Sequence, residues 1–243
     1  MASIYIKEIR LFFSSMIGYL VIGFFLLVLG LMIWVFPEYS VLESNYATLA
    51  QLFELGPFLF TFLIPAITMR SLAQEKSLGT LEFLSTKPLR SLDIIVGKFL
   101  ANLTLVILAI LPTIIYALSI SQLGSPVGNL DTGEILGSYI GLIMLGAGFT
   151  GLGILASAVT DNQISAFLMG VFLCFMFYWG FDLISGLSLF FASGDLLIQK
   201  LGMAFHYNSI SRGVLDMKDL IYFLSLTVFA IVLTDLVLKM NRA

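Results

Sequence analysis

Charged residues are scarce in this sequence. Its 243 residues include 12 Lys and Arg and 15 Asp and Glu, so 11% are charged while 59% are hydrophobic. Soluble globular proteins have about 25% charged and roughly 45–50% apolar residues. So few charges cannot supply a polar surface for a soluble domain of this size, and the composition therefore indicates an integral membrane protein. The net charge of −3, without a basic block, also excludes a nucleic-acid binder.

Cysteine and histidine are almost absent. A single cysteine, Cys174, excludes a disulfide framework and a four-cysteine metal site, and a single histidine, His206, leaves little room for a histidine-based metal centre. The sequence contains no G-x-x-x-x-G-K-[ST] loop for nucleotide phosphates, no G-x-S-x-G turn and no H-E-x-x-H pair. We therefore expect no enzymatic activity and no cofactor bound by this chain.

Long uncharged intervals predict six membrane-spanning helices. At 1.5 Å per residue, about 20 residues cross a hydrocarbon core of ~30 Å. The interval between Glu54 and Arg70 is short and holds Pro57 and Pro65, so this span needs a helix that begins before Glu54 or continues past Arg70. Pro112 predicts a bend in the third span. The expected spans cover residues 16–36, 52–72, 99–119, 135–158, 163–182 and 220–238.

Two other segments are expected to lie at the membrane surface. Residues 3–14 carry Lys7 and Arg10 on one helical face and Ile9 and Phe12 on another, which predicts an amphipathic helix that bends into the first span. A plain extension of that span is the alternative. Residues 186–219 are too apolar for a solvated loop and too short to cross twice, so we expect an interfacial or re-entrant segment.

The distribution of Lys and Arg orients the predicted spans. With six spans, nine of the twelve basic residues lie on the side of both termini. The positive-inside rule makes that side the cytoplasm. Lys200, Arg212 and Lys218 are the exceptions, because they fall in the external segment.

Small residues recur in the fourth span. Gly146, Thr150, Gly153 and Ser157 follow one another at steps of three or four residues, which gives the helix a smooth face that allows close packing. Packing within one subunit is the simpler interpretation, and a subunit interface or transport path is the alternative.

Residues 70–98 form the only sizeable polar segment on the predicted cytoplasmic side. Gly79 is expected to end a helical continuation of the second span. Thr80 is a good N-cap for a following short helix, Glu82 suits its first turn, and Pro88 closes it. Such a helix has the right size to insert into a groove on another protein, whereas a solvated juxtamembrane face is the alternative.

This segment resembles the ABC-2 type transporter permeases. The pattern R-x-x-x-x-E-K-x-x-G-T-x-E-x-L-x-[ST]-x-P follows the second span and precedes a G-K pair at the third. The matching residues are Arg70, Glu75, Lys76, Gly79, Thr80, Glu82, Leu84, Pro88, Gly97 and Lys98. The resemblance implies an all-α membrane protein with six transmembrane helices, an N-terminal elbow helix and a coupling helix that contacts an ATP-binding subunit. It also implies external re-entrant helices, where His206, Arg212 and Gly213 lie.

The resemblance further implies partners and a location. A separate ABC ATPase dimer would bind ATP and Mg²⁺, and a second transmembrane domain would be either another copy or an auxiliary gliding-motility membrane subunit. Both would assemble in the bacterial inner membrane. More narrowly, residues 205–219 and the overall spacing resemble the membrane subunit of the gliding-motility ABC transporter of Bacteroidetes, which implies export or mechanical work in gliding.

A secondary transporter or membrane scaffold that works without nucleotide is the alternative function. Ion-coupled carriers place ionisable residues near the bilayer midplane. The two candidates, Asp182 and Asp235, are expected near the membrane interfaces, so the sequence favours the ATP-driven permease.

Overall fold

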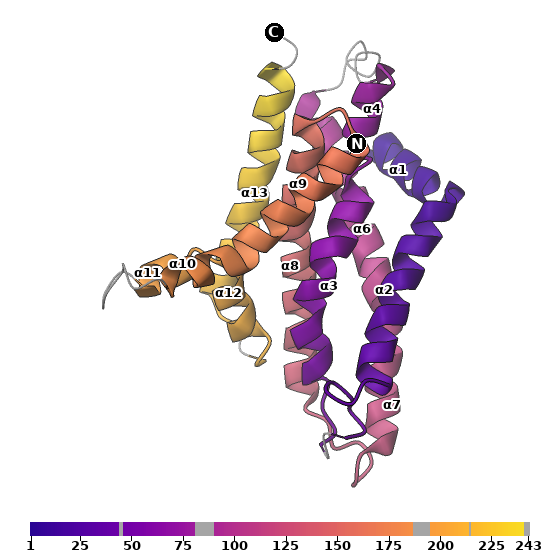
Figure 1. Cartoon of the computed structure of the whole chain (residues 1–243), viewed down its shortest axis with the longest axis vertical. Helices are drawn as coiled ribbons and strands as arrows, with labels where there is room; N and C mark the ends of the chain where they lie inside the picture. The colour runs from indigo at the N-terminus through magenta and orange to yellow at the C-terminus, as the bar shows by residue number, and fades with distance from the viewer. Residues whose placement is uncertain (44–45, 81–89, 187–194, 214, 241–243) are drawn as a thin grey trace.

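The computed structural model describes residues 1–43, 46–80, 90–186, 195–213 and 215–240. Every regular element within these ranges is helical, and six helices are long and apolar enough to cross a membrane. Both termini lie toward one end of the bundle, uppermost in Figure 1, which we call the terminal end. The linker residues 35–43, 46–49 and 124–131 lie at the other, the loop end. The all-α, six-helix fold expected from the sequence is confirmed. The six spanning helices are Met16–Trp34, Ala50–Ser77, Ser91–Leu123, Thr132–Val159, Gln163–Ser185 and Met217–Met240.

The chain begins with a sharp elbow. Helix α1 (Ala2–Ser14) ends at Ser15, whose extended backbone (φ −100°, ψ 136°) separates it from α2 (Met16–Trp34). The Ser15 hydroxyl accepts from the Gly18 amide at 3.3 Å and so caps α2. A Cβ at Gly18 would stand 2.5 Å from the carbonyl oxygen of Phe12, so only glycine allows this close turn. The predicted amphipathic helix that bends into the first span is thus present.

The second spanning helix begins before Glu54, so it is longer than the uncharged interval between Glu54 and Arg70. Helix α3 (Ala50–Thr68) includes Pro57 and Pro65, and the short helix α4 (Ala73–Ser77) follows it after a break. A proline lacks the N–H that continues a helix. The missing N–H of Pro57 leaves the carbonyl of Phe53 without its helical donor, and the hydroxyl of Tyr207 donates to that carbonyl at 2.7 Å.

Pro112 interrupts the third spanning helix, as predicted. Helix α6 (Ser91–Ile110) gives way to a 3₁₀ turn, η1 (Leu111–Thr113), and the chain continues as α7 (Ile114–Leu123). The Thr113 hydroxyl donates to the carbonyl of Ile110 at 2.7 Å inside this turn. The span therefore extends well beyond the predicted range 99–119, because it starts at the terminal end with polar residues such as Ser91.

Helix α8 (Thr132–Val159) forms the centre of the bundle. It packs against five other helices, which are α3, α6, α9 (Gln163–Phe175), α12 (Met203–Ile210) and α13 (Met217–Met240). Its small residues bring these neighbours close. A Cβ at Gly146 would lie 3.1 Å from Val106 of α6, a Cβ at Gly151 would lie 3.1 Å from Ala230 of α13, and Gly153 faces Thr68 of α3. The small-residue face of α8 thus serves packing within the subunit.

The described residues between α9 and α13 do not extend beyond the loop end and lie beside the bundle (Figure 1). Helix α9 continues through a π-helical turn, η2 (Met176–Gly180), into α10 (Phe181–Ser185), and α11 (Asp195–Gln199) follows. In Figure 1, α10 and α11 project sideways and α12 returns beside α8. Met203 lies against Gly148, and Gly213 lies against Gly137 nearer the loop end. The described residues 195–213 thus run beside α8, and the re-entrant course expected over residues 186–219, which include positions outside the described residues, stays a prediction.

Candidate functional site

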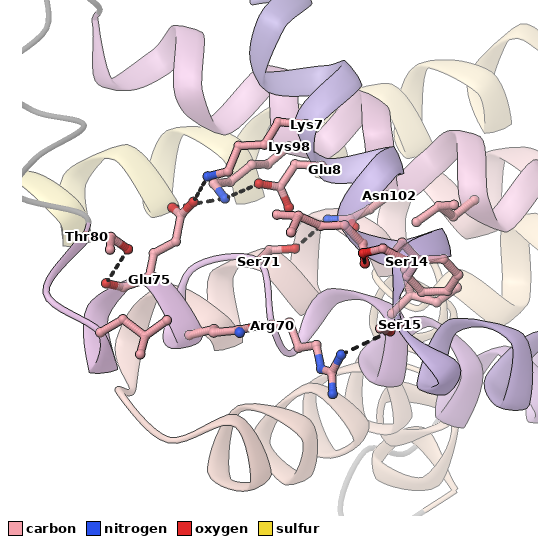
Figure 2. A pocket seen from close by; sticks show the side chains of 16 residues that line it. Lys7, Glu8, Ser14, Ser15, Arg70, Ser71, Glu75, Thr80, Lys98 and Asn102 are labelled. Carbon is pink, nitrogen blue, oxygen red and sulfur yellow. Dashed lines mark hydrogen bonds and ion pairs between the residues drawn. The ribbon is translucent and has the colours of Figure 1, made fainter.

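A polar pocket of about 360 Å³ lies at the terminal end between α1, α6 and the junction of α3 with α4 (Figure 2). The amphipathic α1 contributes Lys7 and Glu8, α4 contributes Glu75, and α6 contributes Lys98. These four charged side chains come from three parts of the sequence, and the elbow at Ser15 brings α1 across to meet the other two helices.

Glu75 is the centre of an ion-pair network that joins these helices. Its Oε1 lies 2.8 Å from Nζ of Lys7, and its Oε2 lies 3.0 Å from Nζ of Lys98. Lys98 Nζ also donates to Oε1 of Glu8 at 2.7 Å. The Lys98 side chain is only 1% exposed, and a charge so deeply buried is stable only when it is paired. The four charges cancel and hold α1, α4 and α6 together.

The network also raises the pKa of Lys7. Partial burial lowers the pKa of this ammonium group, but the hydrogen bond and charge of Glu75, together with the charge of Glu8, outweigh burial and leave the pKa raised. The stability that the pair contributes is therefore fully present below the pKa of lysine in the unfolded chain. It is lost as the pH rises through the raised pKa of the folded protein.

Ser157 of α8 holds the break between α3 and α4. Its hydroxyl accepts from the amides of Leu72 at 3.0 Å and Ala73 at 2.9 Å, and it donates to the carbonyl of Met69 at 3.0 Å. A helix break leaves backbone groups without helical partners, and one buried serine satisfies three of them. Lys76 reinforces the junction, because its ammonium group donates to the carbonyl oxygen of Ala158 at the end of α8.

Arg70 and Asn102 complete the connections of this junction. Nη1 of Arg70 donates to the Ser15 hydroxyl at 3.3 Å, so the end of α3 is bonded to the elbow (Figure 2). Asn102 of α6 donates to the hydroxyl of Ser71 at 2.7 Å. Residues 70–77 are thereby bonded to the elbow, α1, α6 and α8.

A family model for ABC-2 family transporter proteins matches residues 2–242. The chain belongs to the ABC-2 transporter family. No curated protein matches the sequence significantly. The match covers all six spanning helices, so this ABC-2 protein is a multi-pass membrane component.

In this ABC-2 protein, the described part of the predicted ATPase interface gathers at the terminal end. Gly79 has φ +67°, and its amide donates to the carbonyl of Lys76 at 3.0 Å, so the prediction that it ends a helix is confirmed. The Thr80 hydroxyl donates back to the carbonyl of Glu75 at 3.3 Å. The predicted interface residues Glu82, Leu84 and Pro88 lie outside the described residues.

Three predicted interface residues form their polar bonds with other parts of this chain. Arg70 bonds to the elbow, Glu75 to α1 and α6, and Lys76 to the end of α8. Contact of these residues with an ATPase stays a prediction. Sequence reasoning did not find Lys7 and Glu8 as their partners, because the bond between Lys7 and Glu75 spans 68 positions. The sequence did contain one signal for this network, because oppositely charged residues border three different spans.

The residues predicted for the external segment belong to a second polar region. His206 is buried on α12, with Nδ1 2.7 Å from Oδ1 of Asp219 and Nε2 2.9 Å from the carbonyl oxygen of Lys200. Its ring stacks on Tyr222 with centroids 3.9 Å apart. Gly213 has φ +81° and lies against Gly137 of α8, while the neighbouring Arg212 is exposed. Among the described residues, no group of three or more His, Cys, Asp or Glu side chains is arranged to hold a metal ion.

Proposed function

We propose that this chain is the membrane-spanning subunit of an ATP-driven transporter in a bacterial inner membrane. ATP and Mg²⁺ bind to a separate ABC ATPase dimer, and the terminal end faces the cytoplasm. The attachment of residues 70–80 to the rest of the bundle carries this proposal. Family membership supports it, since the chain matches the ABC-2 model along nearly its whole length.

The bonds at the terminal end provide a route for movement. A force applied at residues 80–90 reaches α1 and α6 through Glu75, and it reaches α8 through Lys76 and Ser157. Bonds shielded from water keep their geometry better than exposed ones, so the helices move together rather than separately. The first, second and fifth spans then repack and open a gate at the loop end.

The proposal requires a second transmembrane domain, because two ATP-binding subunits act as a pair. A second copy of this chain or an auxiliary membrane subunit supplies it. Helix α2 offers many exposed apolar side chains for lipid or such a partner, including Leu20, Phe24 and Leu27.

Co-purification with an ABC ATPase tests the proposed function. We expect Glu82→Lys, or deletion of Thr80–Leu84, to lose the ATPase subunit or to uncouple ATP hydrolysis from transport. Glu38→Lys makes the same charge reversal at an exposed residue of the loop end and should leave the complex intact. ATPase binding and ATP-stimulated activity that survive the deletion of Thr80–Leu84 would refute the coupling role.

The narrower role in gliding motility rests on the sequence resemblance of residues 205–219. Deleting the gene in a gliding bacterium tests it separately. Loss of gliding that is restored by the intact chain, and not by Glu82→Lys, would support this role. Normal gliding of the deletion strain would exclude it.

One observation favours the alternative of an ion-coupled carrier. His206 and Asp219 form a buried ionisable pair within the height of the bundle, where carriers place proton-binding groups. By contrast, Asp235 near the terminal end accepts from Ser91 at 2.5 Å and pairs with Lys239 at 2.6 Å. Substrate flux driven by a proton gradient in vesicles without an ATPase would establish the carrier.

A further inference from the structure

A second polar cavity, of about 820 Å³, lies among α10, α12 and the start of α13. Lys200, Arg212 and Lys218 all line it. These are the three basic residues that depart from the gathering of Lys and Arg on the side of the termini. The exceptions to the positive-inside pattern are thus concentrated around one cavity instead of being scattered over a loop.

Helix α8 shows how deep this cavity lies. Phe223 of α13 packs beside Gly148, and Asp219 lies one turn before Phe223. With a rise of 1.5 Å per residue, Asp219 is about 18 Å from the Thr132 end of α8 and about 22 Å from the Val159 end. The cavity therefore lies near the middle of the bundle along α8, beside the first turn of the membrane-spanning helix α13.

The hydrogen bonds of His206 determine the charge of the cavity. Nε2 must donate to the carbonyl of Lys200, because a carbonyl only accepts. The proton on the contact between Nδ1 and Asp219 then belongs either to the imidazole or to the carboxyl group. In both cases His206 and Asp219 together carry no net charge. Among the described lining residues, the three cations that remain are matched by two further carboxylates, Asp182 and Asp216, so this lining has an excess positive charge and favours an anion.

Asp219 also leaves an acceptor available. The residue is 5% exposed, and its Oδ2 has no hydrogen-bond partner among the described residues. A buried acceptor without a donor is unfavourable, so it favours a ligand that brings an N–H or O–H group. The cavity thus offers cations for an anionic group and an unpaired carboxylate oxygen for a donor.

The surroundings of the cavity are apolar. Phe205 lines it and is 37% exposed, and the helices that contribute lining residues expose large apolar side chains elsewhere on their surfaces, including Leu183, Leu197, Met217 and Ile221. A polar cavity beside apolar surface at this depth suits an amphiphile, whose head enters the cavity while its chains remain in the lipid.

We propose that this cavity binds the headgroup of a phospholipid that carries both a phosphate and a hydrogen-bond donor, as phosphatidylethanolamine does. The phosphate contacts Arg212, Lys200 and Lys218, which supply N–H donors and positive charge. The ammonium group donates to Oδ2 of Asp219. In the orientation proposed above, this lipid belongs to the outer leaflet. Binding does not require the ATPase, so its test is independent of the proposed function.

Lipid binding to the purified full chain tests the site. The protein is reconstituted in phosphatidylcholine nanodiscs that contain a small fraction of photoactivatable phosphatidylethanolamine, and crosslinks are mapped by mass spectrometry. We expect crosslinks in residues 195–219. The variant Arg212→Gln with Lys218→Gln should reduce them about tenfold, because charge-assisted hydrogen bonds are lost. Arg10→Gln removes an exposed cation from α1 and should change nothing.

A second comparison tests the role of Asp219. Phosphatidylcholine has a phosphate but no donor, so the intact chain should prefer phosphatidylethanolamine, and Asp219→Asn should remove that preference. If Asp219→Asn lowers the melting temperature and the variant does not fold, the Arg212 and Lys218 variant decides alone. Equal crosslinking of this double variant and the intact chain would overturn the proposal. Displacement of the lipid by equal concentrations of soluble glycerophosphoethanolamine would also overturn it, because the cavity would then bind the free headgroup rather than a membrane lipid.

Discussion

Lys98 and Lys7 share the carboxylate of Glu75 but differ greatly in burial. The Lys98 side chain is 1% exposed, whereas that of Lys7 is 46% exposed. Methionine preserves most of the length of lysine without its charge. We expect Lys98→Met to lower the free energy of unfolding by about 3 kcal/mol or more, because Glu8 loses its cation and the second oxygen of Glu75 loses its partner while both carboxylates stay buried. Lys7→Met should cost below about 1 kcal/mol, since water replaces an exposed partner.

Thermal unfolding in detergent measures this difference. Equal losses for the two variants would show that burial does not govern the network. Restoration of stability by adding Glu8→Gln and Glu75→Gln to Lys98→Met would show that the unpaired carboxylates caused the loss.

Two glycines with the same backbone conformation separate strain from packing. Gly213 has φ +81° and Gly128 has φ +85°. A Cβ at Gly213 would stand 3.0 Å from Cα of Glu134, whereas a Cβ at Gly128 would meet nothing within 4 Å. Gly128→Ala should therefore cost only the left-handed backbone, about 1 kcal/mol. Gly213→Ala should cost about 2–3 kcal/mol, because α12 must also move from α8. Similar melting temperatures for the two variants would contradict this close contact.

Residue roles that depend on local rules could be predicted, and those that depend on tertiary contacts could not. Gly79 ends a helix because glycine readily adopts positive φ, so its position in the sequence was sufficient. Asp219 could be placed near the start of the last span, but nothing local indicated that its carboxylate would turn to His206. Glu75 was expected at an interface with another protein, although its two oxygens contact Lys7 and Lys98.

At the scale of elements, Ser157 determines how α4 is attached to α8. Ser157→Ala removes a partner from the amides of Leu72 and Ala73 and from the carbonyl of Met69. Buried backbone groups left unpaired cost about 1–3 kcal/mol. We expect faster hydrogen exchange at the amides of residues 72 and 73, and weaker stimulation of a bound ATPase.

Thr150→Val is the matched control for Ser157→Ala. The Thr150 hydroxyl is equally buried on α8 but donates to the carbonyl of Gly146 one turn earlier in the same helix. Its loss should cost less than about 1 kcal/mol and should leave exchange at residues 72 and 73 unchanged. Faster exchange in Thr150→Val as well would indicate general loosening of α8 rather than release of α4.

Spanning helices were predictable because uncharged intervals reflect the cost of charge in lipid. Their ends were less predictable, since polar caps extend them. Asp131 accepts from the amides of Gly133 and Glu134, so α8 starts three residues before the predicted span. The depth of α12 was not predictable, because it depends on its packing along Gly137 and Gly148 of α8. An eight-residue helix carries no length signal for crossing a membrane.

Two clusters of described charges lie at different depths of the molecule. Lys7, Glu8, Glu75 and Lys98 gather at the terminal end, and His206, Asp219 and the cations around them gather at the middle of the bundle. The distribution of Lys and Arg among the loops indicated the first cluster, whereas the cations of the second cluster were exceptions to that distribution. The fold explains both, because α12 brings part of a loop back among the helices.

The direction of the molecule in the membrane can be tested with its single cysteine. Cys174 is 0% exposed, so the native chain should not react with a membrane-impermeant maleimide while it is folded. Ser77→Cys at the terminal end and Asn129→Cys at the loop end each introduce one thiol at an exposed position. In intact spheroplasts we expect labelling of Asn129→Cys alone, and in inverted vesicles labelling of Ser77→Cys alone. The reverse pattern would place the terminal end outside, where residues 80–90 could not meet a cytoplasmic ATPase, and the proposed coupling would fail.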